Sequence, residues 1–131
     1  MRVRGPTAAE ALGRLALAMS ELLTGGATVE ARPGEDATVV VEGGPDLAGS
    51  AVALLRELLY RFATAREIPA AIEVVRVDAT GVEARVAFGP YDRERHAGGL
   101  DLKAVTRHAA RLGREGDGEG EAWVAQAVFD V

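Results

Sequence analysis

Residues 122–131 read Ala-Trp-Val-Ala-Gln-Ala-Val-Phe-Asp-Val, and this stretch decides the fold. Every second position from Trp123 to Val131 is apolar, and Val124 and Val128 lie among the positions between them. Apolar residues on both faces indicate a strand that is covered on both sides, as in the middle of a sheet. We therefore expect the chain to end in a central strand.

Two earlier stretches have the apolar spacing of amphipathic helices. The first begins at the capping box Thr7-Ala8-Ala9-Glu10, where the hydroxyl oxygen accepts a backbone N–H, and it ends at Gly25-Gly26. The second runs from an Asp46 cap to about Arg66, and Pro69 marks its exit. Leucines recur every three or four residues in both, so each helix is expected to bury one face.

The remaining segments have the alternation or the β-branched content of strands, and they are joined by turn residues. The expected hairpin pairs are Thr28–Ala31 with Thr38–Glu42, Ala71–Asp78 with Val82–Phe88, and Leu100–Arg114 with Ala122–Val131. Residues 115–120 are acidic and rich in glycine. We expect them at a hairpin tip, because their carboxylates would repel a bound phosphate.

This order of elements predicts an α+β fold, with a mostly antiparallel β-sheet and two amphipathic α-helices packed on it. The chain has 131 residues, enough to bury one core but not two. We therefore expect a single domain over residues 1–131.

The composition excludes several kinds of chemistry. The chain has no cysteine, which excludes disulfides, a thiolate nucleophile and cysteine metal sites, and fits the reducing cytoplasm. No apolar run approaches the roughly 20 residues that span a bilayer, so we expect no membrane contact. The net charge of -5 argues against direct binding to nucleic acid, so RNA would be held by a partner. The scarcity of asparagine and glutamine fits either a thermophile or a biased base composition.

Neither a nucleophile constellation nor a phosphate loop is present in the sequence. Ser20 and Ser50 fall within the expected helices, and no G-x-S-x-G or G-x-x-x-x-G-K-[ST] pattern occurs. A hydrolase that acts through a covalent intermediate is therefore not expected.

Lys103 is the only lysine in a chain with fifteen lysines and arginines together. An ammonium group can lose its proton or act as a point charge, whereas a guanidinium group stays charged and planar. Polar and apolar residues alternate around Lys103, as they do on a strand with one face in solvent. This spacing fits a functional lysine and an ordinary exposed lysine equally.

Three stretches together resemble the archease family. They are Pro90-Tyr91-Asp92-Arg93-Glu94-Arg95-His96, Lys103-Ala104-Val105-Thr106-Arg107-His108 and the final Asp130-Val131. They follow the family's P-x-D-x-x-x-H connection, K-A-V/I-T-x-H strand and terminal aspartate with one aliphatic residue. The start of the first helix, Gly5–Leu12, and the Leu54–Tyr60 part of the second are also similar to archease sequences, so the resemblance spans essentially the whole chain.

The resemblance implies a protein cofactor, rather than an enzyme, for an RtcB-type RNA ligase in tRNA splicing and RNA repair. Such a protein promotes the GTP-dependent guanylylation and the multiple turnover of the ligase. It also implies that Lys103, His96, Asp92 and His108 face this partner, and that Asp130 and the Val131 carboxylate bind a divalent cation, Ca²⁺ or Mg²⁺. A solvated chain end is the alternative for these last two residues.

One part of the family pattern is missing. Archease sequences usually have an H-T-A-D strand before the first helix, and its aspartate is a second metal ligand. Here Met1–Arg4 directly precede Gly5, so we expect weaker metal binding and a shortened edge strand. Either the start was assigned too late or this copy of the protein is reduced.

The residues themselves leave other roles open. His96 and His108 are the only histidines and fit metal binding, proton transfer or simple packing, and Asp92 fits a turn cap as well as a binding site. A general protein-interaction or chaperone-like module, which uses the two-helix face without metal or GTP, is the main alternative function. A small metal-dependent enzyme is a third.

Overall fold

A computed structural model describes residues 1–34, 36–116 and 120–131. In these residues the chain forms two helices and six strands. They are β1 (Arg2–Gly5), α1 (Ala8–Thr24), β2 (Asp36–Glu42), α2 (Leu47–Ala65), β3 (Glu67–Asp78), β4 (Gly81–Pro90), β5 (Ala104–Arg114) and β6 (Trp123–Asp130).

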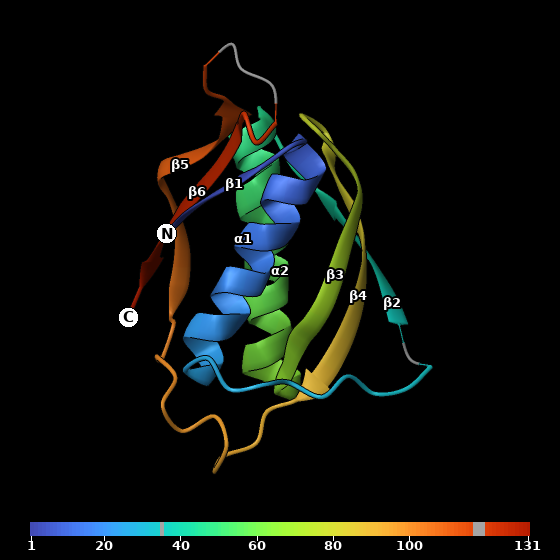
Figure 1. Cartoon of the computed structure of the whole chain (residues 1–131), viewed down its shortest axis with the longest axis vertical. Coiled ribbons are helices and arrows are strands. Elements are labelled where there is room, and N and C mark those ends of the chain that lie inside the picture. The colour runs from blue at the N-terminus through green and yellow to red at the C-terminus, as the bar shows by residue number, and fades with distance from the viewer. Residues whose placement is uncertain (35, 117–119) are drawn as a thin grey trace.

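The strands form two three-stranded antiparallel sheets with the orders β1-β6-β5 and β2-β4-β3. Figure 1 shows both helices between the two sheets, and α1 contacts β1, β3 and β6 while α2 contacts β2, β3, β4 and β5. The α+β prediction is confirmed, but the strands divide into two sheets instead of one. The buried residues of each helix occupy more than half of its circumference, so one sheet alone would leave part of this apolar surface in water.

Local capping sets the helix ends as predicted. The Thr7 hydroxyl oxygen accepts the N–H of Glu10 at 3.1 Å, and the Asp46 carboxylate accepts that of Gly49 at 2.8 Å. Helix α1 ends at Gly25, which has a φ of 68°, a conformation that glycine adopts without a Cβ clash.

The predicted hairpin of β3 and β4 is confirmed, and both strands are longer than expected. Asp78 pairs with Gly81 at the turn, and Val82, Ala84, Val86 and Phe88 are buried. Pro69, expected where the second helix exits, lies inside β3 at the first of two register shifts. Proline is accommodated there because β3 is an edge strand.

The predicted hairpin of Thr28–Ala31 with β2 is wrong. Residues 28–31 are not a strand, and β2 pairs with β4. The earlier segment instead crosses the end of β4, where the N–H of Arg32 donates to the Phe88 carbonyl at 3.0 Å. A Cβ atom on Gly89 would overlap the Glu30 carbonyl oxygen, so glycine permits this close crossing.

The last hairpin is confirmed, although β5 begins at Ala104 rather than Leu100. Ala104 pairs with Asp130 and Arg114 with Trp123, and β6 is the central strand of its sheet as predicted. The N-terminal strand β1 lies at one edge of this sheet. The expected hairpin tip at 115–120 includes residues 117–119, which lie outside the described residues.

Candidate functional site

Asp92 caps a turn in the connection between β4 and β5. Its Oδ1 accepts the N–H of Arg95 at 3.1 Å and that of Glu94 at 2.9 Å. These hydrogen bonds lower the pKa of the Asp92 carboxyl below its ordinary value, and the one from the Arg95 N–H has the largest effect. The geometry therefore supports the capping role that the sequence left open for this residue.

His96 holds the same connection against the segment that follows α1. Its Nδ1 accepts the N–H of Asp92 at 2.9 Å, and its Nε2 lies 3.1 Å from the Thr28 carbonyl oxygen. The hydrogen therefore lies on Nε2 and is donated to Thr28. The ring is 2% exposed and its centroid is 5.5 Å from that of Tyr91. Both nitrogens are used by the backbone, and this arrangement supports a structural role.

Lys103 lies just before β5, beside the end of β6. Its backbone N–H donates to the carbonyl oxygen of Asp130 at 2.8 Å, so the two residues are adjacent across the sheet. Its side chain is exposed, and in the described ranges its ammonium group makes no ion pair. The amine is thus free to meet an anionic group on another molecule.

A hollow of about 380 Å³ lies between α2 and the start of β5. It is lined by Arg56, Leu59, Tyr60, Ala63, Lys103, Ala104 and Val105. Arg56 crosses from the helix to the strand, where its Nε donates to the Val105 carbonyl at 2.9 Å. Tyr60 is 63% exposed, which is unusual for an aromatic residue. The hollow therefore combines two cationic side chains with an accessible aromatic ring.

The sequence prediction missed Arg56 and Tyr60 as site residues. Both lie off the apolar stripe of the second helix, where exposed residues are ordinary. The signal that could have found them is Tyr60 itself, because a tyrosine on the exposed side of a helix does not pack in the core and often marks a contact surface. Only the fold shows that this side faces the start of β5.

His108 projects from an irregular part of β5. The register passes from Thr106 opposite Val128 to Arg111 opposite Gln126, and the residues between them bulge out. Ala109 has a φ of 58°, and its carbonyl oxygen accepts the Gln126 side-chain N–H at 2.7 Å. A bulge changes the direction of the strand's side chains, and His108 is exposed.

Asp130 and Val131 lie at the end of β6, where both are exposed. In the part of the chain that the structure describes, no group of three or more histidine or acidic residues is placed to hold a metal ion. Ca²⁺ takes six to eight oxygen ligands, so Asp130 would supply only part of a coordination sphere. Binding of Ca²⁺ or Mg²⁺ by Asp130 and the Val131 carboxylate stays a prediction.

The structure thus brings together only part of the predicted set. Lys103, Asp130 and Val131 meet where β5 begins and β6 ends, and His108 lies farther along β5. Within the described ranges, no hydrogen bond or ion pair joins Asp92 or His96 to them. The candidate site is therefore the Lys103 hollow with the neighbouring end of β6.

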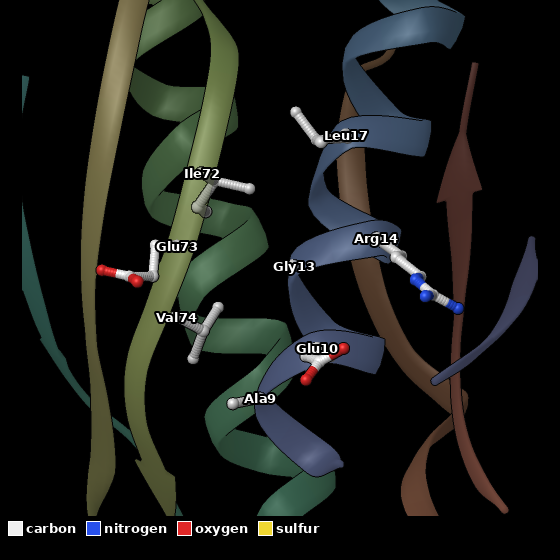
Figure 2. A pocket seen from close by; sticks show the side chains of 8 residues that line it. All are labelled: Ala9, Glu10, Gly13, Arg14, Leu17, Ile72, Glu73 and Val74. Atoms are coloured by element: carbon white, nitrogen blue, oxygen red, sulfur yellow. The ribbon is translucent and has the colours of Figure 1, made fainter. Parts of the chain in front are cut away.

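A larger hollow of about 400 Å³ lies between α1 and β3 (Figure 2). Glu10 and Arg14 point from the helix and Glu73 belongs to the strand. Arg14 already donates to the Glu121 carboxylate at 2.5 Å and to the Arg4 carbonyl at 2.8 Å. None of the predicted site residues lines this hollow, and its lining contains no serine, threonine or lysine.

The sequence matches the Archease protein family (MTH1598/TM1083) over residues 1–131, the whole chain. The chain belongs to the archease family. This archease matches no curated protein in the comparison. Membership supports an accessory role with a protein partner. No helix among the described residues is long and apolar enough to cross a membrane.

Proposed function

We propose that this archease activates an RtcB-type RNA ligase in the cytoplasm, during tRNA splicing or RNA repair. It would promote the GTP-dependent guanylylation of the ligase and so allow each ligase molecule to turn over many times. The family match over the whole chain is the observation that carries this proposal. The net charge of -5 supports contact with RNA only through the ligase.

Lys103 is the residue we propose to act at the interface. Its ammonium group is exposed beside the end of β6 and is not neutralised by a carboxylate in the described ranges. A positive charge at this position would stabilise the phosphate charge that develops during guanylate transfer on the ligase. Arg56 and Tyr60, which line the same hollow, would contact the ligase surface around it.

The two serine hydroxyls of the chain support a helper rather than a serine hydrolase. Ser20 and Ser50 are buried, and their Oγ atoms donate to the carbonyl oxygens of Ala16 at 3.4 Å and Asp78 at 2.6 Å. Each hydroxyl is thus used within the fold. A serine nucleophile needs a neighbouring base and access to substrate, and neither residue has this arrangement.

The experiment is ligase turnover with excess RNA, GTP and metal, with and without this protein. We expect many rounds with it, about a tenfold loss with Lys103→Ala, and partial retention with Lys103→Arg if charge is what matters. Arg85→Ala, which removes an exposed cation from β4, is the matched control and should act as wild type. Equal turnover without the protein would contradict the proposal.

Binding of Ca²⁺ or Mg²⁺ near Asp130 remains a separate prediction. Isothermal titration with each ion should give heat that Asp130→Asn removes, because the change deletes a charged oxygen ligand. If titration of the isolated chain gives no heat, this result would argue against metal binding by this protein on its own. The ligase assay would still stand, because it measures turnover.

A metal-independent interaction module is the second candidate. The exposed Tyr60 and Val40, each 63% exposed, favour it because such side chains mark protein contacts. This module would not use a joint two-helix face, since each helix packs mainly on strands. It predicts partner binding that persists in chelator and with Asp130→Ala, whereas the leading proposal predicts an effect on GTP-dependent turnover.

A further inference from the structure

Four of the strands in the described residues lie at sheet edges, and three of these four have features that hinder pairing with another chain. Strand β1 has only four residues. Strand β3 contains Pro69 and two register shifts. Strand β5 bulges between Thr106 and Arg111, and Arg56 already occupies the carbonyl of Val105.

Strand β2 lacks all of these features. Its seven residues pair with β4 in continuous register, from Asp36 opposite Ala87 to Glu42 opposite Gly81. Within residues 1–34, 36–116 and 120–131 it pairs with no other strand. The run Thr38-Val39-Val40-Val41 contains no lysine, proline or glycine, and Val40 is 63% exposed. A regular β-branched edge of this kind is a template for one more strand.

The charges around this edge are mostly acidic, and Arg85 of β4, opposite Thr38, is a cation among them. Asp36 and Glu42 lie at its two ends, and Glu83 of β4 lies opposite Val40. None of the three makes an ion pair in the described part of the chain. If β2 of a second copy paired antiparallel with this strand and centred on Val39, Asp36 of each copy would lie opposite Glu42 of the other. The like charges would then repel at both ends of the pair. A segment with basic residues at these positions is the complementary occupant.

A hollow of about 450 Å³ beside this edge offers room for side chains of the added strand. It lies between β2 and α2 and is lined by Val40, Val41, Glu42, Ala53, Arg56, Glu57 and Tyr60. Tyr60 gives an aromatic surface and Glu42 a carboxylate. Strand addition draws affinity from backbone hydrogen bonds and specificity from such hollows.

We infer that the free edge of β2 binds an extended segment of a protein partner as an additional strand, and that this segment carries lysine or arginine at both ends. The inference goes beyond the proposed function, because it requires neither the ligase reaction nor GTP or metal. It assigns the edge of β2 as an interaction surface that adjoins the Lys103 hollow and shares Arg56 and Tyr60 of α2 with it.

The probe is a peptide of the length of β2, in which valine and threonine alternate between terminal lysines. Titrated into the isotope-labelled full chain, it should shift the amide resonances of β2 and slow their hydrogen exchange. A matching peptide with terminal glutamates should bind at least about tenfold more weakly. A lysine peptide with alternate N-methylated amides should also lose binding, because it cannot complete the backbone ladder.

Variants of the chain test the surface itself. Val40→Lys should weaken the lysine peptide about tenfold, while Val75→Lys, at a 49% exposed position on β3, should not. Asp36→Lys combined with Glu42→Lys should reverse the preference to the glutamate peptide. Equal binding of the N-methylated peptide would overturn strand addition. Resonance shifts confined to elements other than β2 and α2 would overturn it as well. A dimer of the chain that Val40→Lys dissolves, without peptide binding, would show a second copy as the occupant and overturn the basic segment.

Discussion

Backbone groups hold both ring nitrogens of His96, so replacing this residue should destabilise the fold. We expect His96→Ala to lower the free energy of unfolding by about 2–3 kcal/mol, since it leaves the Asp92 amide without its acceptor and opens a small cavity. His108→Ala, at the exposed histidine, should stay within about 0.5 kcal/mol of wild type. Urea unfolding followed by circular dichroism measures both, and equal losses would contradict the structural assignment.

Asp78 gives a residue-scale prediction for pH. The Thr80 hydroxyl, the Thr80 N–H and then Arg76 donate to its carboxylate, and together they lower its pKa below the ordinary 3.8. A carboxyl with a lowered folded-state pKa stabilises the fold above the unfolded value and loses this contribution as pH falls. The difference in urea midpoint between wild type and Asp78→Asn should therefore shrink as the pH drops below about 4. The difference in urea midpoint between wild type and Thr80→Ala should shrink in the same way. A difference that stays constant with pH would argue against this linkage.

At the scale of the element, the cap of α1 can be tested by itself. Thr7→Ala should lower the free energy of unfolding by about 1 kcal/mol, because it removes the acceptor of the Glu10 N–H. Thr7→Ser keeps a hydroxyl at the cap and should retain most of the stability. Thermal or urea unfolding of the two variants distinguishes the hydrogen bond from loss of the side chain as such. Equal destabilisation would show that the cap bond contributes little.

The elements also show what the sequence could predict. Helix ends depend on neighbours such as Thr7 and Gly25, so the local pattern was sufficient. The choice of a strand's partner is non-local, and the predicted hairpin failed because β2 pairs with β4. The nearness of Lys103 and Asp130 followed from the hairpin of β5 and β6, which a short connection favours. The hollow was missed because Tyr60 reaches it from a different part of the chain.

For the whole molecule, the placement of both helices between two sheets predicts cooperative unfolding. Leu58 is fully buried in α2, a helix that contacts strands of both sheets. Leu58→Ala should lower the free energy of unfolding by about 2–5 kcal/mol. Amides of β4 and of β6, the central strands of the two sheets, should lose protection against hydrogen exchange by similar amounts, because neither sheet keeps its apolar face covered once the helix layer loosens. Val75→Ala, at an exposed position, should leave both unchanged. Protection lost in one sheet alone would show that the two sheets unfold separately and that the helix layer does not couple them.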